Sequence, residues 1–364
     1  MTGFGRPGYA GPERASRLGY LDWARGLAVL LMINTHAFSA WTAAEDRATR
    51  LFGVARLFGG YPAPLFLFVA GVSAALVAEK ERTKGMDSRE VRRRARRHGL
   101  TVLGYAFVFR LAMLASGGFG RAADLLRVDV LNCIAVSLRL VACALGRPSP
   151  TGRLVAALGL GAGVALLTPL AWDPSWWREW PVPLAGYFTG RVPDAPFPLF
   201  PWTAFMALGA ACGLVLAHAR ARGREAATIG LMAAAGAAAI PIALWVDRHA
   251  PAVYPAYDFW HTSPSYVVLK GGVLLVLFGL AFLLDRVPGP SALRQLGRTS
   301  LLVYWAHLEI VYGKWIAPGL RGVLSVREAG VGVVVLVLTM LALSLARTQA
   351  HGGWRLRGDE LAKA

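Results

Sequence analysis

Apolar stretches of membrane-spanning length recur along almost the whole of this 364-residue chain. An α-helix needs roughly 20 apolar residues to cross the hydrocarbon core of a bilayer, and about ten segments come close to that requirement. They lie near residues 26–42, 60–79, 99–116, 128–146, 153–171, 199–218, 227–246, 265–284, 297–317 and 329–346. The sequence therefore predicts an all-α, polytopic integral membrane protein with about ten transmembrane helices.

The composition agrees with this interpretation. Hydrophobic residues make up 55% of the chain, charged residues only 16%, and the mean hydropathy is +0.47. Soluble proteins usually carry about a quarter charged residues. A cleaved signal peptide is the alternative for the first apolar stretch, but Asn34 and His36 lie inside it and argue against cleavage.

The basic residues of the chain are unevenly distributed about the expected spans. The net charge of +18 could indicate a nucleic-acid partner. However, most of the Lys and Arg residues fall in segments that share one side of the membrane with both termini, which predicts cytoplasmic termini, a cytoplasmic-membrane location and no nucleic acid. The densest run, Arg92 to Arg97, is interpreted as an orientation signal that meets anionic lipid headgroups; docking of a phosphorylated donor is the alternative.

The chain is expected to form one membrane domain over residues 19–347. A Gly-, Pro- and Arg-rich segment over 1–18 is predicted to be disordered, and 348–364 to be a short polar cytoplasmic tail. The three cysteines fall inside expected spans without metal-ligand spacing, so neither a disulfide nor a metal site is predicted. No phosphate-binding glycine motif is found.

Arg25 and His36 form the most informative pair. Eleven residues separate them, so on a helix they point within about 20° of each other and lie about 16 Å apart along the axis. Asp22, Val29 and Met32 fall on the same stripe. A helix that could otherwise face lipid therefore has one ionisable seam, which should face the protein interior.

Further polar residues fall inside the other expected spans. They are Arg110, Asp129, Asn132, Arg139, Lys270, Tyr304, His307 and Glu309. Intramembrane charge costs roughly 2.5 to 3.5 kcal/mol per residue on insertion scales, so these groups should pair or line a watery cavity. Asp129, Asn132 and Arg139 share a face of the fourth span within about 80°. Ion pairs that serve only the fold are the alternative for Arg110, Asp129 and Arg139.

His36 is the candidate general base. An imidazole titrates near neutrality and can take a proton from a hydroxyl or an amine as acyl transfer begins. An adjacent carboxylate would fix its tautomer, and both Asp129 and Glu309 are candidates for that role. His307 is the alternative base, or a residue that positions the acceptor.

Four segments resemble the transmembrane acyltransferase superfamily, specifically the bacterial relatives of heparan-alpha-glucosaminide N-acetyltransferase. They run from Leu21 to His36, from Pro64 to Gly71, from Phe197 to Trp202 and from Leu296 to His307. The resemblance covers about 20–347. Its most specific element is Arg25, ten further residues and then His36, which is similar to the basic-x10-His motif of membrane O-acyltransferases.

The resemblance implies a catalytic His36 and an Arg25 that helps to hold acetyl-coenzyme A supplied from the cytoplasm. Arg110, Arg139 and Lys270 are expected to assist with the donor. Asn132, Tyr304 and Trp202 are expected to position an extracytoplasmic carbohydrate or glycolipid acceptor. No histidine lies within residues 41–57, where the lysosomal enzyme of the family has its functional histidine. Direct transfer is therefore preferred to an acetyl-histidine intermediate.

A transporter or exporter of a polar or lipid-linked solute is the competing class, because it would use the same buried charges. A transporter must tolerate the loss of an acyl donor, whereas an acyltransferase cannot. The identity of the acceptor, N- or O-acylation, and whether the chain forms a homo-oligomer are left open by the sequence.

Overall fold

The computed structural model describes residues 18–117, 125–193, 195–250, 253–254 and 257–361, the last eleven by their backbone alone. In these residues all of the regular structure is helical. The long helices are α1 (Gly19–Trp41), α3 (Pro62–Thr83), α4 (Ser88–Ala115), α5 (Val130–Leu145), α6 (Pro150–Ala171), α9 (Leu199–Arg220), α10 (Glu225–His249), α11 (Pro264–Asp285), α13 (Ser300–Tyr312) and α14 (Val326–Leu361). The short ones are η1 (Glu45–Ala48), α2 (Arg50–Leu57), η2 (Phe58–Gly60), α7 (Pro174–Trp177), α8 (Val182–Ala185), α12 (Ala292–Arg298) and η4 (Pro318–Leu320).

Within this described part, seven helical segments are long and apolar enough to cross a membrane. They lie at residues 50–83, 88–115, 150–171, 199–220, 225–249, 264–285 and 326–350. The all-helical, multi-span prediction is therefore confirmed, whereas the count of ten and the side on which the termini lie are not. The expected spans in α1, α5 and α13 are helical but fall outside the seven: α1 carries several polar residues, and α5 and α13 have only 16 and 13 residues.

Local sequence explains where several helices begin. Asp129 is the N-cap of α5, where Oδ1 accepts hydrogen bonds from the amides of Leu131 (2.9 Å) and Asn132 (3.2 Å). This places Asp129 at the start of α5, and not on a face within it as expected, because a carboxylate satisfies the amides that a helix leaves unpaired at its first turn. Pro62 opens α3, in the first turn, where a missing amide hydrogen costs nothing.

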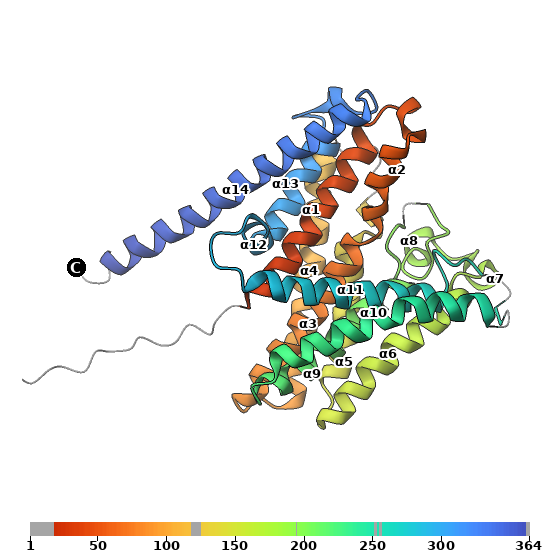
Figure 1. Cartoon of the computed structure of the whole chain (residues 1–364), viewed down its shortest axis with the longest axis vertical. Helices are drawn as coiled ribbons and strands as arrows, with labels where there is room; N and C mark the ends of the chain where they lie inside the picture. The colour runs from red at the N-terminus through yellow and green to blue at the C-terminus, as the bar shows by residue number, and fades with distance from the viewer. Residues whose placement is uncertain (1–17, 118–124, 194, 251–252, 255–256, 362–364) are drawn as a thin grey trace, which may run out of the picture.

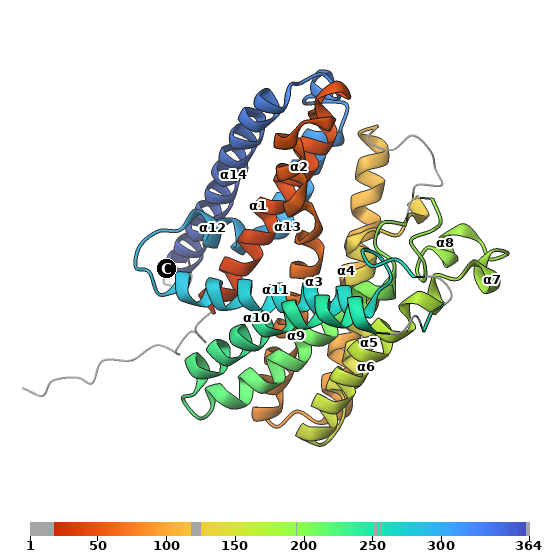
Figure 2. The same cartoon turned by 45° about the vertical axis from the view of Figure 1, so that its right-hand side comes forward.

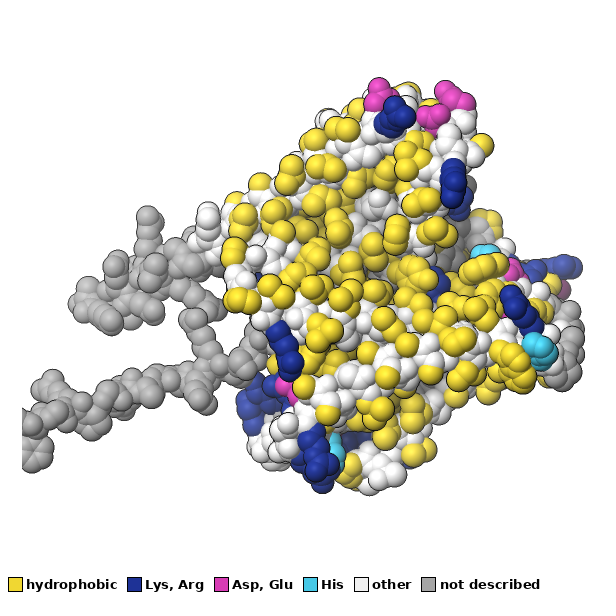
Figure 3. All heavy atoms as spheres, viewed as in Figure 1, with side chains coloured by type: hydrophobic (Ala, Val, Ile, Leu, Met, Phe, Trp, Pro, Cys, Tyr) yellow, Lys and Arg dark blue, Asp and Glu magenta, His cyan; other side chains and the backbone are white. Residues whose placement is uncertain are grey.

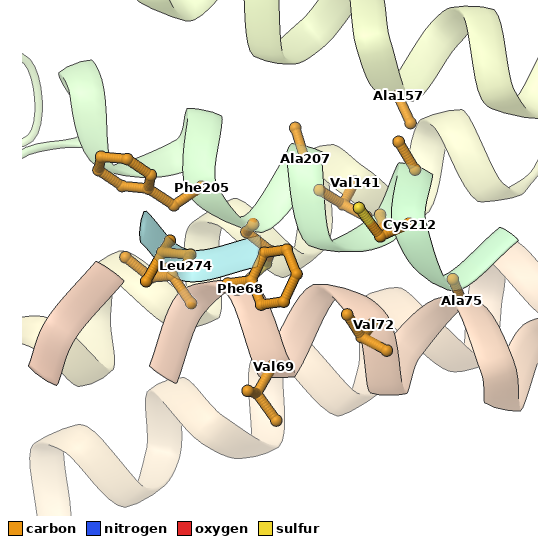
Figure 4. Close-up of a cluster of buried hydrophobic side chains, with 14 of the residues drawn as sticks. Phe68, Val69, Val72, Ala75, Val141, Ala157, Phe205, Ala207, Cys212 and Leu274 are labelled. Carbon is orange, nitrogen blue, oxygen red and sulfur yellow. The ribbon is translucent and has the colours of Figure 1, made fainter. Parts of the chain in front are cut away.

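Helices α3 and α9 cross very closely. A Cβ atom built on Gly71 would lie 2.1 Å from the carbonyl oxygen of Met206, and one on Gly209 would lie 2.0 Å from that of Phe68. Small residues let two helix backbones approach closely. The resulting van der Waals contacts stabilise helix association in a membrane, where lipid removes the hydrophobic driving force. Figure 4 shows the apolar cluster beside this crossing, where Phe68 and Val72 of α3 face side chains of α9.

Helix α1 runs from the middle of the molecule to its upper end in the view, and it packs closely against α12 (Figure 1). Cβ atoms on Gly26 and Gly297 would each lie 1.8 Å from a backbone oxygen of the other helix. Helix α12 ends at Arg298, and Thr299 has non-helical angles before α13 begins. The expected span over 297–317 is therefore interrupted at Thr299, and its main helix, α13, ends at Tyr312.

The remaining helices surround this centre. Helices α10 and α11 pack side by side, and α14 lies at the edge of the bundle against α1, α12 and α13 (Figures 1 and 2). The visible face is largely apolar, and its charged side chains gather toward the edges (Figure 3). The expected disordered segment over 1–18 lies outside the described residues except for Leu18. Helix α14 continues past residue 347, where the tail was expected to begin, as far as Leu361.

Candidate active site

His36 faces a cavity of about 440 Å³, here called the His36 cavity. Its lining is mostly apolar and aromatic, with a few polar side chains that converge from several helices, as small-molecule sites usually are. The residues that line it are Met32, Thr35, His36, Gly59, Pro62, Ala63, Phe66, Phe109, Met113, Arg127, Asp129, Val130, Pro196, Phe197, Trp202, Tyr304, Leu308 and Tyr312.

The partner of the His36 ring is a phenol. Nδ1 of His36 lies 3.0 Å from the hydroxyl oxygen of Tyr312, at the end of α13. The ring of His307 lies behind it, with centroids 5.5 Å apart. His307 is fully buried, and its Nδ1 lies 2.7 Å from the carbonyl oxygen of Val303. Because a carbonyl oxygen only accepts hydrogen bonds, Nδ1 carries the proton and donates a hydrogen bond to Val303. Its Nε2 has no hydrogen-bond partner in the described part of the chain.

Neither candidate carboxylate is hydrogen-bonded to His36. Glu309 accepts a hydrogen bond from the hydroxyl of Ser116 at 3.1 Å. Asp129 lines the His36 cavity, but one of its oxygens lies 3.1 Å from Nη2 of Arg110. The structure therefore places Tyr312, and neither of the acids suggested by the sequence, beside the candidate base.

Arg110 is held by protein groups on every side. It is fully buried, donates to the carbonyl of Leu125 at 2.8 Å, and donates to Oδ1 of Asn132 as well as to Asp129. The amide of Asn132 donates in turn to the hydroxyl of Tyr187 at 2.9 Å. These contacts leave Arg110 and Asn132 inside the wall of the cavity, where they hold Asp129 in place and do not line the cavity themselves.

Arg25 faces a second cavity, of about 510 Å³, here called the Arg25 cavity. Its guanidinium donates to the hydroxyl of Ser73 at 2.7 Å and lies 3.3 Å from the carboxylate of the buried Asp22. The residues that line this cavity are Arg25, Phe66, Ala70, Ser73, Ala74, Val77, Ala78, Glu81, Val91, Arg94, Ala95, His98, Val102, Ile134, Leu138 and Ser300.

The two cavities are arranged end to end along the same helices. On α1, Arg25 faces one and His36 the other, about 16 Å apart. Helices α3, α4, α5 and α13 likewise contribute to both cavities from opposite ends. Phe66 lines both, and it packs against all three apolar core clusters of the described residues. A single aromatic side chain therefore stands between the two cavities.

Residues 17–257 match the family model of the heparan-alpha-glucosaminide N-acetyltransferase catalytic domain. The chain belongs to this family. No curated protein matches the chain significantly. Family membership and the apolar helices make this heparan-alpha-glucosaminide N-acetyltransferase-like chain a membrane acyltransferase. The matched residues include Arg25, His36, Phe66 and Asp129. His307 and Tyr312 lie beyond the matched residues.

Of the other residues predicted for the site, the structure places some at the His36 cavity and others away from it. Tyr304 and Trp202 line the His36 cavity. Lys270 is buried away from it: its Nζ donates to the carbonyl of Gly60 and lies 4.3 Å from the ring centroid of Tyr61. Arg139 lines neither of the two cavities but lies in a separate arginine-lined groove. Nothing in the described residues groups three or more metal-ligating side chains together.

Sequence reasoning missed Tyr312, Phe66 and Ser73. Tyr312 follows His307 by five residues, but its contact with His36 joins two helices that are far apart in the chain. Phe66 lies in an apolar run that also contains Phe68, and the sequence does not indicate which of these aromatic side chains faces a cavity. Ser73 is a small polar residue within α3, and only the position of Arg25 shows its role.

Proposed function

We propose that this protein transfers an acyl group, most simply acetyl, from acyl-coenzyme A on the cytoplasmic side to an amine or hydroxyl of an extracytoplasmic carbohydrate or glycolipid. The observation that supports it is the pair of cavities that share Phe66, one with Arg25 and the other with His36. A membrane-crossing transfer needs a donor chamber and an acceptor chamber that meet at one point.

The Arg25 cavity is proposed as the donor site. It combines the cations Arg25 and Arg94 with apolar side chains of α3 and α4. Guanidinium groups suit phosphate oxygens, and the apolar wall suits a long, largely uncharged arm. The excess of basic residues near this end of the helices favours a cytoplasmic position for it. The thioester would then reach past Phe66 to His36.

His36 is proposed as the general base. When Nδ1 carries the proton and donates a hydrogen bond to the hydroxyl oxygen of Tyr312, Nε2 is the basic nitrogen. Nε2 takes the proton from the acceptor amine or hydroxyl as its nitrogen or oxygen attacks the thioester carbonyl carbon. A new amide or ester bond forms, the carbon–sulfur bond breaks, and the coenzyme A thiolate leaves and takes up a proton.

The His36 cavity is proposed as the acceptor site. Trp202, Phe197 and Tyr304 supply aromatic surfaces, and Asp129 supplies a carboxylate that can accept hydrogen bonds from hydroxyl groups or an amine. An amino sugar offers both an amine and hydroxyl groups to such a site, and the name of the matching family refers to a glucosaminide. An amino sugar is therefore the acceptor that we propose first.

Binding and turnover of labelled acetyl-coenzyme A by the detergent-purified protein test this proposal. Arg25→Ala should weaken donor binding, and His36→Ala should lower acetyl turnover by about 10²-fold or more while donor binding persists. Arg298→Ala is the matched control for Arg25, because Arg298 is exposed and lines neither cavity. His307→Ala, measured in parallel, tests the alternative base.

The outcomes separate the competing functions. Loss of turnover in His307→Ala but not in His36→Ala would make His307 the base. Absence of donor binding by the folded parent would remove coenzyme A from the proposal and favour the transporter, which needs no acyl donor.

A further inference from the structure

One strongly charged part of the surface belongs to neither the Arg25 cavity nor the His36 cavity. A groove of about 450 Å³ lies at the junction of α4 and α5 and is here called the arginine groove. Six guanidinium side chains and one leucine line it, with no acidic residue in the lining. These residues are Arg89, Arg92, Arg93, Arg96, Arg97, Leu100 and Arg139.

Two glycines hold arginine stems in the groove. A Cβ on Gly99 of α4 would lie 2.7 Å from Cγ of Arg139, and a Cβ on Gly146 would lie 2.8 Å from Cβ of Arg92. Nη1 of Arg139 also donates to the carbonyl of Arg96 at 3.4 Å. The aliphatic parts of Arg92 and Arg139 therefore pack against glycines of the neighbouring helix end or helix, and their guanidinium groups meet in one groove.

The charges of the groove are poorly neutralised by the protein. Arg93 pairs with Glu90 on the same helix. Arg89 and Arg93 also interact with the charge of the exposed Asp87, whereas the described residues form no salt bridge with Arg92, Arg96 or Arg97. Like charges this close repel one another, so a multivalent anion between them would be favoured.

The groove faces away from the proposed donor site. At about 100° per residue, Arg89, Arg93 and Arg96 lie on one side of α4. Val91, His98 and Val102 line the Arg25 cavity from the opposite side. A phosphorylated donor in the Arg25 cavity would therefore leave this groove unfilled.

An exposed apolar track continues from the groove along the same side of α4. Leu100 lines the groove, and Leu100, Phe107 and Leu111 are 51%, 39% and 56% exposed. They lie within about 60° of Arg96 around the helix. A ligand that meets both features needs a polyanionic head and long apolar chains.

We propose that the arginine groove is a binding site for an anionic phospholipid with more than one phosphate. The headgroup phosphates lie among the guanidinium groups, which can bind phosphate oxygens in a bidentate manner. The acyl chains run along the Leu100, Phe107 and Leu111 track. The proposal is independent of the transferase chemistry, because no residue of the groove lines either cavity.

Native mass spectrometry of the detergent-purified full chain tests the site. Cardiolipin, phosphatidylglycerol and phosphatidylcholine are added separately, and inorganic pyrophosphate and coenzyme A serve as soluble phosphate competitors. The groove variant combines Arg92→Gln, Arg96→Gln and Arg139→Gln. The control variant combines Arg222→Gln, Arg224→Gln and Arg298→Gln, which removes equal charge at exposed arginines outside the groove.

The parent should bind cardiolipin more tightly than phosphatidylglycerol, and phosphatidylcholine least. The groove variant should bind cardiolipin about tenfold or more weakly, while the control variant should match the parent. Equal losses in both variants, unchanged binding in the groove variant, or displacement of the lipid by coenzyme A or pyrophosphate would overturn the proposal. Arg96→Gln alone, at an exposed position, repeats the comparison should the triple variant fail to fold.

Discussion

At the residue scale, the polar groups inside the bundle divide into those that hold the wall and those that face a cavity. Arg110 and Asn132 are buried in hydrogen bonds and ion pairs with other protein groups. His36 and Asp129 reach a cavity. Arg110, whose partners are all buried protein groups, stabilises the fold, whereas the His36 ring has one nitrogen bonded and faces a cavity, as the proposed role of a base requires.

Tyr312→Phe should lower acetyl turnover by roughly tenfold while the protein still folds and binds donor. The change removes the hydroxyl that lies 3.0 Å from Nδ1 of His36 and with it the orientation of the ring. A lost hydrogen bond of this kind costs about 1–3 kcal/mol. Steady-state kinetics with labelled acetyl-coenzyme A measure it. Turnover equal to that of the parent would show that Tyr312 does not orient the base.

Arg110→Met should destabilise the protein by about 3–5 kcal/mol, because it leaves the carboxylate of Asp129 without its charge partner. Thermal unfolding in detergent, followed by tryptophan fluorescence, measures the change. The double variant Arg110→Met with Asp129→Asn should recover part of the loss, since it removes the unpaired charge. A double variant less stable than either single one would contradict this account.

At the element scale, glycines decide which helices cross closely. The α3–α9 crossing allows no side chain at Gly71 or Gly209, and the α1–α12 crossing allows none at Gly26 or Gly297. These crossings fix the positions of α1 and α3, which carry Arg25, His36 and Phe66. The geometry of the cavities therefore depends on residues that have no chemistry of their own.

Gly209→Ala should destabilise the bundle by about 1–3 kcal/mol or more, because the new methyl group would overlap the carbonyl oxygen of Phe68. Gly159→Ala is the matched control on α6, since a Cβ there meets nothing within 4 Å. The yield of monodisperse protein and the unfolding midpoint of both variants provide the comparison. Equal behaviour of the two would mean that the crossing relaxes without cost.

At the scale of the whole molecule, the two cavities and the side chain between them define a path through the bundle. Phe66 contacts all three apolar clusters, so it is positioned by the packing of the entire bundle. The proposed transfer requires the thioester to pass this side chain.

Phe66→Trp should lower acetyl transfer about tenfold or more with little change in donor binding, because a larger ring between the cavities would obstruct the arm and not the phosphate contacts of Arg25. Phe66→Leu is the control with a smaller apolar side chain, and it should retain transfer. Parallel measurement of donor binding and turnover distinguishes the two effects. Transfer by Phe66→Trp equal to that of the parent would contradict a path that passes this side chain.

The sequence by itself determined the helical, membrane-spanning class and the family. These follow from local quantities: hydropathy summed over one helix, and motifs read along the chain. The spacing of Arg25 and His36 also follows from the sequence, because three helical turns return eleven residues to the same face. The ends of the helices were predicted less accurately. A capping residue such as Asp129 decides where a helix begins, and hydropathy alone does not show this.

Only the tertiary structure decided which groups meet. Tyr312 next to His36, Ser73 next to Arg25, and Phe66 between two cavities are contacts between different helices. Such contacts depend on crossing angle and close approach, which arise from many side chains packed together. The same packing buried Arg110 among protein partners, although its residue type alone suggested a role in binding the donor.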